Sequence, residues 1–404
     1  MPPVPSPASA NPDLRILHVT PFYDDAWAYG GIPRVVPRLC RGLAARGHRV
    51  TVLTTDACDQ HRRLRWKHDQ HAETGVTVEI LPNLSNRAAY QQLFWPLGLR
   101  RFFAEHRAAF DVAHLHACRN LLTSGAARAL KSAGVPYVVS PHGTAPRIER
   151  RLVAKALYDR FIDHHTLRDA ARIVVVSDAE RRQLVELGVS PAPLVIVENP
   201  LDGEELVSLP ASGALRQKVP FDEILLFVGK ITPRKRLDLL IEALAVMDRP
   251  RAGLVVIGND MGGERAARAL VRARGLEQRV VFLGLVAGAE RLAAMRDADL
   301  LAYPSRDEVF GLVPFEALGC GIPVVVADDS GCGELVAQVG GGLVVRSGDI
   351  AALATALTQL LDDKPAWRAA AAEAHRILED RFGRDRAAAR LEAVYADAVR
   401  EARP

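Results

Sequence analysis

Two successive series of short, β-branched runs, each run followed by a stretch rich in alanine, leucine and arginine, constrain the fold of this chain most strongly. Such alternation predicts βα units and a parallel sheet, because parallel neighbouring strands need a crossover helix between them. The runs are almost continuously apolar, as expected of strands that helices cover on both faces. The first series occupies residues 14–20, 49–55, 76–82, 111–117, 136–143, 172–177 and 194–200, and the second occupies 223–230, 253–259, 279–284, 299–305, 323–328 and 342–348.

A polar stretch with glycine and proline, residues 202–222, separates the two series. We therefore predict an α/β fold of two facing Rossmann-like domains, each a doubly wound parallel sheet. The predicted N-terminal domain covers residues 14–203 and the C-terminal domain covers 204–384, after a disordered tail at 1–13. The chain reads as helical from about residue 350, and the last helix, 385–404, is expected to pack back on the first domain.

The composition predicts a globular protein of the cytoplasm. Of the 404 residues, 49% are hydrophobic and 25% are charged, and no apolar run reaches the length of a membrane span. The first residues have neither the basic nor the apolar region of a secretion signal. A net charge of +4 is too small to indicate nucleic acid as a partner. The scattered cysteines, Cys40, Cys58, Cys118, Cys320 and Cys332, lack zinc-site spacing and suit buried thiols in a reducing compartment.

Two basic stretches suggest a contact with a charged surface. Residues 94–107, FWPLGLRRFFAEHR, mix aromatic side chains with arginine, and residues 146–151, PRIERR, add further basic charge. One interpretation is a solvated amphipathic helix and a charged loop. The other is peripheral contact with an anionic membrane on its inner face, or with a phosphorylated lipid acceptor.

In doubly wound sheets, ligands bind beyond the carboxyl ends of the strands, so candidate site residues should directly follow the apolar runs. Gly30 and Gly31 come after the first run and precede a helix. Glycines let the backbone approach a ligand closely, and a helix N-terminus offers free amides to a phosphate. An ordinary turn is the alternative interpretation of this glycine pair.

Histidines also follow strands of the first series. In SPHG, His142 and Gly143 end the run 136–143, just past the predicted strand, where a histidine can reach a sugar hydroxyl or serve as a capping or core residue. His114 and His116 resemble a metal-binding pair, because alternate residues of a strand point to one face. No third ligand is evident in the sequence, so we do not predict a metal there.

The second series begins with a run that leads into GKITPRKR, residues 229–236. This segment places Lys230, Arg234, Lys235 and Arg236 directly after a buried strand. Cations at such a position can neutralise a diphosphate, whereas an ordinary surface loop would explain only one or two of them.

Two glutamates, Glu308 and Glu316, flank the segment VFGLVPF. Residues 312–318 are predicted to form a short helix, with Pro314 in its first turn and glycines after its end. Eight helical residues would span about 12 Å, so this spacing does not build a close carboxylate pair. One carboxylate can instead hold sugar hydroxyls and the other a ribose diol, with the amides of residues 310–313 meeting the phosphates between them. Two solvated glutamates near a helix start are the alternative.

With these residues in place, the chain resembles glycosyltransferase family 4, the retaining nucleotide-sugar transferases with the two-domain GT-B architecture. The resemblance covers nearly all of residues 14–385, and its most specific part is PSRDEVFGLVPFEALGCGIPVV, residues 304–325. This segment is similar to the family motif of two glutamates separated by seven residues. Supporting matches are YGGIPRVV (29–36), SPHG (140–143), NPLD (199–202), VGKITPRK (228–235) and SGCGELV (330–336).

The resemblance implies roles for individual residues. As binding residues for the donor it implies Gly30, Gly31, Lys230, Lys235, Phe310, Gly311, Leu312, Val313 and Glu316, with Glu316 holding the ribose hydroxyls. As catalytic residues it implies Glu308 and His142 near the transferred sugar, and Lys230 and Lys235 on the departing diphosphate. Val309 stands where many family members have glycine, which leaves the conformation of this loop open.

The resemblance also implies a reaction: metal-independent, retaining transfer of a hexose from a nucleotide sugar, UDP in preference to GDP, to a saccharide or lipid-linked acceptor. Synthesis of a cell-surface polysaccharide or glycolipid would be the setting. Asp297–Ala298–Asp299 spells the D-x-D string of metal-dependent transferases, but it lies at a predicted helix-to-strand junction. We expect capping or buried aspartates there, and no cofactor.

Two other functions are compatible with the same fold. A nucleotide-sugar epimerase or a sugar-phosphate synthase would keep the architecture and change the reaction. A non-catalytic, two-lobed nucleotide-binding module would keep the pocket and lose the chemistry. Detection of a glycoside, and not an isomerised nucleotide sugar, would favour the transferase over the epimerase or synthase. Slow hydrolysis of the donor would favour an enzyme over a binding module.

Overall fold

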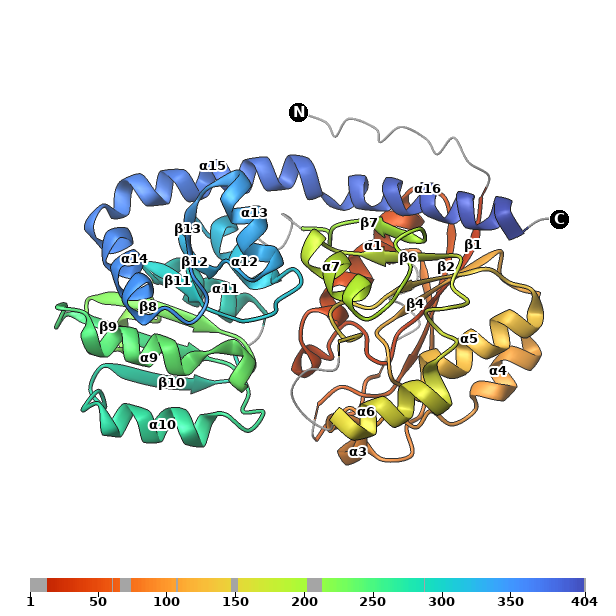
Figure 1. Ribbon diagram of the computed structural model, residues 1–404, viewed down its shortest axis with the longest axis horizontal. Coiled ribbons are helices and arrows are strands. Elements are labelled where there is room, and N and C mark those ends of the chain that lie inside the picture. Colours follow the sequence, from red (N-terminus) through yellow and green to blue (C-terminus); the bar gives the residue numbers. More distant parts are fainter. Residues whose placement is uncertain are drawn as a thin grey trace. The chain divides into compact units, whose positions relative to one another are not determined.

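The computed structural model describes residues 13–59, 61–65, 74–106, 108–146, 152–201, 213–286 and 288–402. Its contacts divide the chain into two compact units, Met1–Pro200 with Arg384–Pro404 and Leu201–Gly383. Each unit is a parallel sheet flanked by helices (Figure 1). The predicted tail, apart from Asp13, lies outside the described residues, as do residues 202–212 of the predicted linker and 147–151 of the second basic stretch.

The first unit contains a sheet of order β3-β2-β1-β4-β5-β6-β7, in which all neighbouring strands run parallel. Each strand falls within one of the apolar runs of the first series, so the predicted parallel sheet is confirmed. The strands are β1 (Arg15–Val19), β2 (Arg49–Thr55), β3 (Val76–Leu81), β4 (Val112–His116), β5 (Tyr137–Ser140), β6 (Arg172–Val175) and β7 (Leu194–Ile196).

Helices of the first unit come from both ends of the chain. The helix α16 (Arg384–Ala402) packs on α1 (Ile32–Ala45) and buries Leu391 and Tyr395. In Figure 1, α16 is the dark blue helix and α1 is the red one. The other helical segments are η1 (Trp27–Tyr29), α3 (Asn86–Tyr90), α4 (Leu99–Glu105), α5 (Leu121–Ala133), α6 (Leu152–Tyr158), the π-helical η2 (Asp159–Asp163) and α7 (Asp178–Glu186).

The second unit contains a parallel sheet of order β10-β9-β8-β11-β12-β13, again built from the predicted runs. Its strands are β8 (Glu223–Val228), β9 (Ala252–Ile257), β10 (Val280–Gly284), β11 (Leu300–Tyr303), β12 (Val324–Ala327) and β13 (Gly342–Val345). Its helical segments are η3 (Arg216–Lys218), η4 (Pro233–Lys235), α9 (Leu237–Val246), α10 (Glu264–Ala273), α11 (Gly288–Asp297), α12 (Leu312–Gly319), α13 (Gly331–Val339), α14 (Ile350–Asp362) and α15 (Lys364–Phe382).

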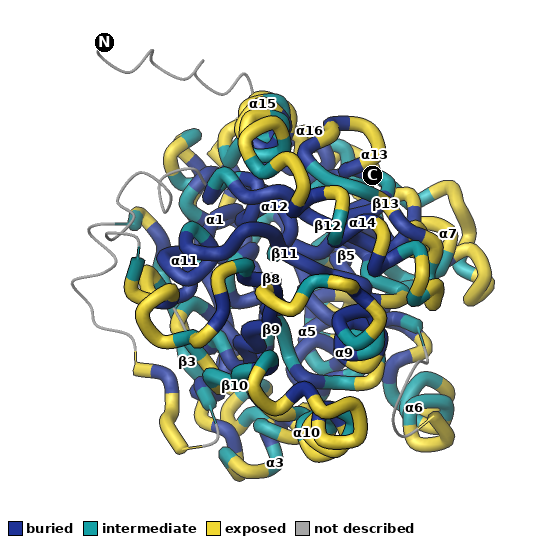
Figure 2. The backbone as a smooth tube through the Cα atoms, turned by 90° about the vertical axis from the view of Figure 1, so that its left-hand side faces the viewer, coloured by how far each residue is buried: buried dark blue, intermediate teal, exposed yellow. Residues whose placement is uncertain are grey.

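The central strands are buried because helices cover both faces of each sheet. In the second unit, Leu225 and Phe227 of β8, Leu254 of β9 and Leu300 of β11 have no exposed surface. Figure 2 shows β8 and β11 in dark blue, whereas α6 and α10 carry long exposed segments. Burial on both faces explains why the runs are continuously apolar rather than alternating.

Each sheet has one point at which the order of the strands reverses. In the first unit this switch lies between β1 and β4, and in the second unit between β8 and β11. The loops that leave the two strands turn to opposite faces there, which opens a crevice for ligands at the carboxyl edge. The loops after β8 and β11 contain Lys235 and Glu308, so the topology brings these two segments together.

Candidate active site

The loop after β8 is held against the neighbouring strand end by a close backbone contact. A Cβ atom added to Gly258, just past β9, would lie 1.8 Å from the carbonyl oxygen of Gly229, so only glycine fits there. Lys230 follows this contact, and the short helix η4 then turns Lys235 back over Gly229, with its Cε 3.8 Å from the position that a Gly229 Cβ would take. The loop thereby places its lysines at the carboxyl edge of the sheet.

Lys235 and Glu308 form an ion pair inside this crevice. Their side chains are only 11% and 14% exposed, and the Lys235 ammonium donates to the carboxylate of Glu308 and to the hydroxyl of Tyr303. The Tyr303 hydroxyl lies 3.1 Å and the Ser305 hydroxyl 3.2 Å from the same oxygen, Oε2 of Glu308. An ammonium has three N–H donors, and the described residues engage two of them, which leaves one for a ligand oxygen.

The electrostatic environment keeps Glu308 ionised. Burial by itself would raise the pKa of this carboxyl, but the positive charges of Lys235 and Arg234 and the hydrogen bonds from Lys235 and Tyr303 lower the pKa to about 2. At neutral pH the side chain is therefore a fixed negative charge and a hydrogen-bond acceptor. Such a carboxylate suits recognition of hydroxyl groups and does not suit the role of a general acid.

The predicted short helix is confirmed as α12, and Glu308 lies in the loop before it. Gly311 caps the helix with φ of 74°, and an added Cβ would lie 3.1 Å from the Sγ of Cys332 and 3.3 Å from the Cγ of Glu308. The positive φ favours glycine at this position, and a larger residue would also crowd Cys332 and Glu308. The amides of the first turn of α12, which begins at Leu312 with Val313 next, point away from the helix at this end.

Val309 fits the loop in spite of its β-branched side chain. The residue is buried, and it is not among the non-glycine residues with positive φ, whereas nearby Asp307 has φ of 53°. The position that family members often fill with glycine therefore does not require glycine's conformational freedom in this chain. Phe310, the next residue, is buried against Phe315 with ring centroids 5.1 Å apart.

Glu316 lies on α12 and pairs with an arginine. Its Oε2 accepts a hydrogen bond of 2.5 Å from Nη1 of Arg291 on α11, and both side chains are buried. The structure thus brings Lys235 and Glu308 into direct contact and gives Glu316 a separate partner. The role of Glu316 as an acceptor for ribose hydroxyls stays a prediction.

In the first unit, Gly30 and Gly31 lie between η1 and α1. Gly30 has φ of 101°, a conformation that favours glycine, and Gly31 is the N-cap of α1. The pair therefore leads directly into the first turn of a helix whose second residue is Pro33. This is the predicted local arrangement, and binding of a phosphate by it stays a prediction.

His142 lies just past β5 with φ of 51°, in the left-handed region that few non-glycine residues adopt. Its Nε2 lies 3.0 Å from Nδ1 of His116 on β4, and the rings are stacked. The next residue, Gly143, donates its backbone N–H to Oε1 of Glu180 on α7 at 2.6 Å, and Val176 donates to the other oxygen of Glu180 at 2.9 Å. The side chains of His116 and Glu180 therefore hold this strained loop in place.

Glu180 gives the first unit a pH-dependent stability. Burial raises the pKa of this carboxyl from 4.5 to about 7, against the two backbone N–H donors, which lower it. Between pH 4.5 and about pH 7, the Glu180 carboxyl has lost its proton in the unfolded chain and has kept it in the folded chain. The free energy of unfolding therefore falls as pH rises through this range. In Glu180→Gln this contribution is absent, so urea unfolding at pH 4.5 and pH 8 should show the variant gaining stability relative to the parent protein as pH rises.

Glu186→Gln is the matched control, since Glu186 is an exposed glutamate at the end of the same helix. Its unfolding midpoint should follow that of the parent protein at both pH values. Parallel midpoints for Glu180→Gln as well would contradict the raised pKa of Glu180.

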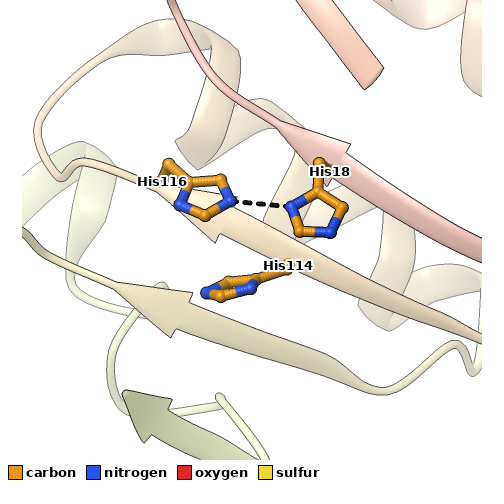
Figure 3. Close-up of side chains that lie close together, drawn as sticks. All are labelled: His18, His114 and His116. Atoms are coloured by element: carbon orange, nitrogen blue, oxygen red, sulfur yellow. Dashed lines mark hydrogen bonds between the residues drawn. The ribbon is translucent and has the colours of Figure 1, made fainter. Parts of the chain in front are cut away.

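The expectation that His114 and His116 lack a third partner is wrong. β1 pairs with β4 in a register that sets His18 opposite His114, and the three buried histidines each place a ring nitrogen within 4.8 Å of the others (Figure 3). Most of these nitrogens already have protein partners. His114 bonds the hydroxyls of Tyr395 at 2.6 Å and Ser140 at 2.7 Å, and His116 bonds His18 at 2.9 Å.

Asp297 and Asp299 are structural, as the sequence indicates. Asp297 accepts from the backbone N–H groups of Gly213 and Leu215, the latter at 2.8 Å. Asp299 accepts from the N–H of Ile224 at 2.8 Å and from Arg216 at 3.0 Å. Both residues are buried; Asp299 fixes the start of β8, and Asp297 fixes the backbone before η3.

Within the basic and aromatic stretch at 94–107, residues Leu99–Glu105 form the helix α4, and Arg107 lies outside the described residues. Phe102 and Phe103 are buried, whereas Trp95 and Leu97 before the helix are exposed. No helix among the described residues has the length and apolar character to cross a membrane. The five cysteines are buried thiols, as expected.

Several site residues are not evident from the sequence. Tyr303 and Ser305 stand at and after the end of β11 and converge on Glu308, and Arg291 on α11 pairs with Glu316. Glu180 has a sequence signal, because Ser177 and Glu180 match the capping pattern Ser-x-x-Glu at the start of α7. His18 stands in an apolar run, as His114 and His116 do, and only the register of β1 against β4 shows their contact.

Comparison with known proteins gives matches over both units. The profile described as Glycosyltransferase Family 4 matches residues 29–205, and that described as Glycosyl transferases group 1 matches residues 214–377. Among solved structures, sucrose-phosphate synthase from Thermosynechococcus elongatus matches with a TM-score of 0.76 and 22% identity over 96% of this chain and 100% of that chain. Anabaena HepE, in complex with UDP and glucose, matches with a TM-score of 0.71 and 20% identity over 95% of this chain and 99% of that chain.

Two relatives in sequence carry the name D-inositol 3-phosphate glycosyltransferase. That of Stackebrandtia nassauensis is 31% identical over 83% of this chain and 80% of its own length. That of Kineococcus radiotolerans is 38% identical over 58% of this chain, and the match spans 60% of that relative's length. The two matched profiles, over two Rossmann-like units, identify a glycosyltransferase of GT-B architecture. The chain belongs to glycosyltransferase family 4.

Proposed function

We propose that the protein transfers a hexose from a nucleotide sugar to a hydroxyl of its acceptor with retention of configuration and without a metal ion. The observation that carries the proposal is the largely buried cluster of Lys235, Tyr303 and Glu308 at the switch point of the second sheet. It sets a cation with a remaining donor beside an ionised acceptor, which are the groups that a sugar pyrophosphate needs.

The cations are proposed to bind the diphosphate. Lys230, Arg234 and Lys235 bring three positive charges to one loop, against the single negative charge of Glu308. During transfer, negative charge grows on the departing nucleoside diphosphate. Fixed cations and the amides at the start of α12 stabilise this charge without reorganisation.

The acidic residues are proposed to bind the hydroxyls. Glu308, ionised at neutral pH, accepts from a hydroxyl of the transferred sugar, and Glu316 accepts from the ribose. Gly30, Gly31 and His142 of the first unit are further proposed contacts of the donor. In a retaining reaction of this family type, the acceptor attacks from the face that the diphosphate leaves, so no carboxylate nucleophile is required, unlike in retaining glycosidases.

Metal independence leads to a direct expectation. The cations of the loop after β8 take the place that a divalent ion has in metal-dependent transferases, and Asp297 and Asp299 are engaged with backbone N–H groups. We expect turnover to be unchanged after dialysis against EDTA and after addition of Mg²⁺ or Mn²⁺. A tenfold loss with EDTA that Mn²⁺ restores would contradict this expectation.

The donor is proposed to carry UDP. Anabaena HepE, a structural relative, was solved with UDP-glucose. The test is release of nucleoside diphosphate from a panel of UDP- and GDP-sugars, with thermal stabilisation by UDP and GDP measured in parallel. Stabilisation by neither nucleotide, or an isomerised nucleotide sugar in place of a glycoside, would contradict the proposal.

For the acceptor, we propose a saccharide or lipid-linked saccharide of cell-surface polysaccharide or glycolipid synthesis. Leu93, Trp95 and Leu97 are exposed before α4, and α6 has no buried residue, which supports an apolar acceptor or peripheral contact with a membrane. Sedimentation with vesicles containing phosphatidylglycerol tests this contact, and Trp95→Ala should weaken it. Equal recovery in the supernatant with and without vesicles would count against it.

The names of the sequence relatives favour a second candidate acceptor, a phosphorylated cyclitol. The donor panel should therefore be repeated with inositol phosphates and with lipid-linked saccharides. Formation of a glycoside with only one class of acceptor decides between the two candidates.

A further inference from the structure

Three histidines of the first unit form a hydrogen-bonded chain that ends at His142. Nδ1 of His18 on β1 lies 2.9 Å from Nε2 of His116 on β4, and Nδ1 of His116 lies 3.0 Å from Nε2 of His142 after β5. The His18 and His116 rings are stacked at an interplanar angle of 10°, and those of His116 and His142 at 17°. Figure 3 shows the first link as a dashed line, with His114 beside it and outside the chain.

All three rings are neutral at physiological pH. Burial lowers the pKa of His18 to about 3 and that of His142 to about 4, and it lowers the pKa of His116 well below its usual range. A neutral imidazole has one N–H and one bare nitrogen. In each link one ring therefore donates and the other accepts, so the whole chain has only two consistent arrangements of protons.

The buried end of the chain selects one of these arrangements. His18 has no exposed surface, and its Nε2 has no hydrogen-bond partner among the described residues. An N–H group buried without an acceptor is rarer in proteins than an acceptor without a donor. His18 therefore carries its proton on Nδ1 and donates to His116. His116 in turn donates from Nδ1 to Nε2 of His142, which leaves the proton of His142 on its own Nδ1.

We propose that His18 and His116 are positioning residues that fix the tautomer of His142, so that its Nδ1–H is a permanent hydrogen-bond donor toward a substrate oxygen. Of the described residues, none bonds to this Nδ1, and the side chain is only partly buried. The matching ligand atom is a sugar hydroxyl or a phosphate oxygen. In this tautomer Nδ1 has no lone pair for a proton, so it is not a general base.

The tautomers can be measured directly in the protein without substrate. With ¹⁵N-labelled histidine, long-range ¹H–¹⁵N correlation spectra distinguish a protonated from a bare ring nitrogen at each residue. We expect the Nδ1–H form at His18, His116 and His142. An Nε2–H form at His142, or a doubly protonated ring at pH 7, would overturn the proposal. This inference rests on the proposed function only for the identity of the ligand, so the spectrum tests it even if transfer is not observed.

Variants of His18 separate the effect on the tautomer from packing. His18→Leu removes the first donor, and we expect a mixture of tautomers at His142 and a fall of about tenfold in kcat, the usual net effect of losing one hydrogen bond. In His18→Asn the side-chain amide can donate in the place of Nδ1, so the tautomer and most of kcat should return.

His114→Asn is the matched control, because His114 is equally buried on the same strand as His116 but bonds Ser140 and Tyr395 instead. It should lower stability and leave the tautomer of His142 unchanged. If His114→Asn alters that tautomer as His18→Leu does, packing and not the hydrogen-bonded chain sets it, and the proposal fails.

Discussion

Lys235→Ala is expected to lower kcat for sugar transfer by about 10²- to 10³-fold, the usual cost of removing one fixed donor to a developing charge. The side chain of Lys235 is only 11% exposed and lies beside Glu308 and Tyr303, where water screens its charge weakly. The change also removes the main cation that holds the pKa of Glu308 low, so burial will then raise the pKa of that carboxyl. Steady-state release of nucleoside diphosphate measures the effect.

Lys218→Ala provides the control for this change. Lys218 is an exposed lysine of the same unit, at the end of η3, and its loss should leave kcat within twofold of the parent value. Thermal unfolding of both variants shows whether the fold is retained. A folded Lys235→Ala protein with undiminished turnover would exclude the proposed role of this lysine.

Glu308→Gln is expected to lower kcat by about 10²-fold with a smaller change in KM, because glutamine keeps the shape of the side chain and loses its charge. The amide oxygen can still accept from Tyr303 and Ser305, so the loop should remain folded. The loss therefore reports on the charge that Glu308 offers to Lys235 and to the sugar. Initial rates over a range of donor concentrations separate kcat from KM.

Asp307→Asn removes a neighbouring charge without touching the cluster. Asp307 is 40% exposed, pairs with Arg306 at 3.3 Å, and has a positive φ that asparagine also tolerates. Its kcat should match that of the parent protein. Equal losses in the two variants would mean that general electrostatics of the loop, and not Glu308 itself, supports turnover.

The sequence predicted the parallel sheets because a continuous apolar run is a local signal. Every described strand overlaps such a run, and β9 alone among them begins outside its run, one residue earlier at Ala252. The sequence also places α12 correctly, since Gly311 and Pro314 mark its start. The family motif then singled out Lys235 and Glu308.

Contacts between distant segments were harder to predict, because they depend on side-chain direction and register. Glu316 shows this best: the sequence places it on α12 but contains no sign that Arg291 reaches it from α11. Likewise, an alternation of histidines in β4 indicates a shared face, yet the partner from β1 follows only from pairing His18 with His114. Rules of local sequence do not encode either contact.

The packing of α16 on α1 has a consequence for the order of assembly during translation. The first unit includes residues from Arg384 onward, so α16 cannot pack on α1 while the ribosome is still synthesising the intervening unit. Tyr395, which bonds to His114, is missing from the nascent protein until the whole second unit has been synthesised. The second unit, Leu201–Gly383, can therefore fold before the first unit is complete. This reverses the usual order, in which the N-terminal domain folds first.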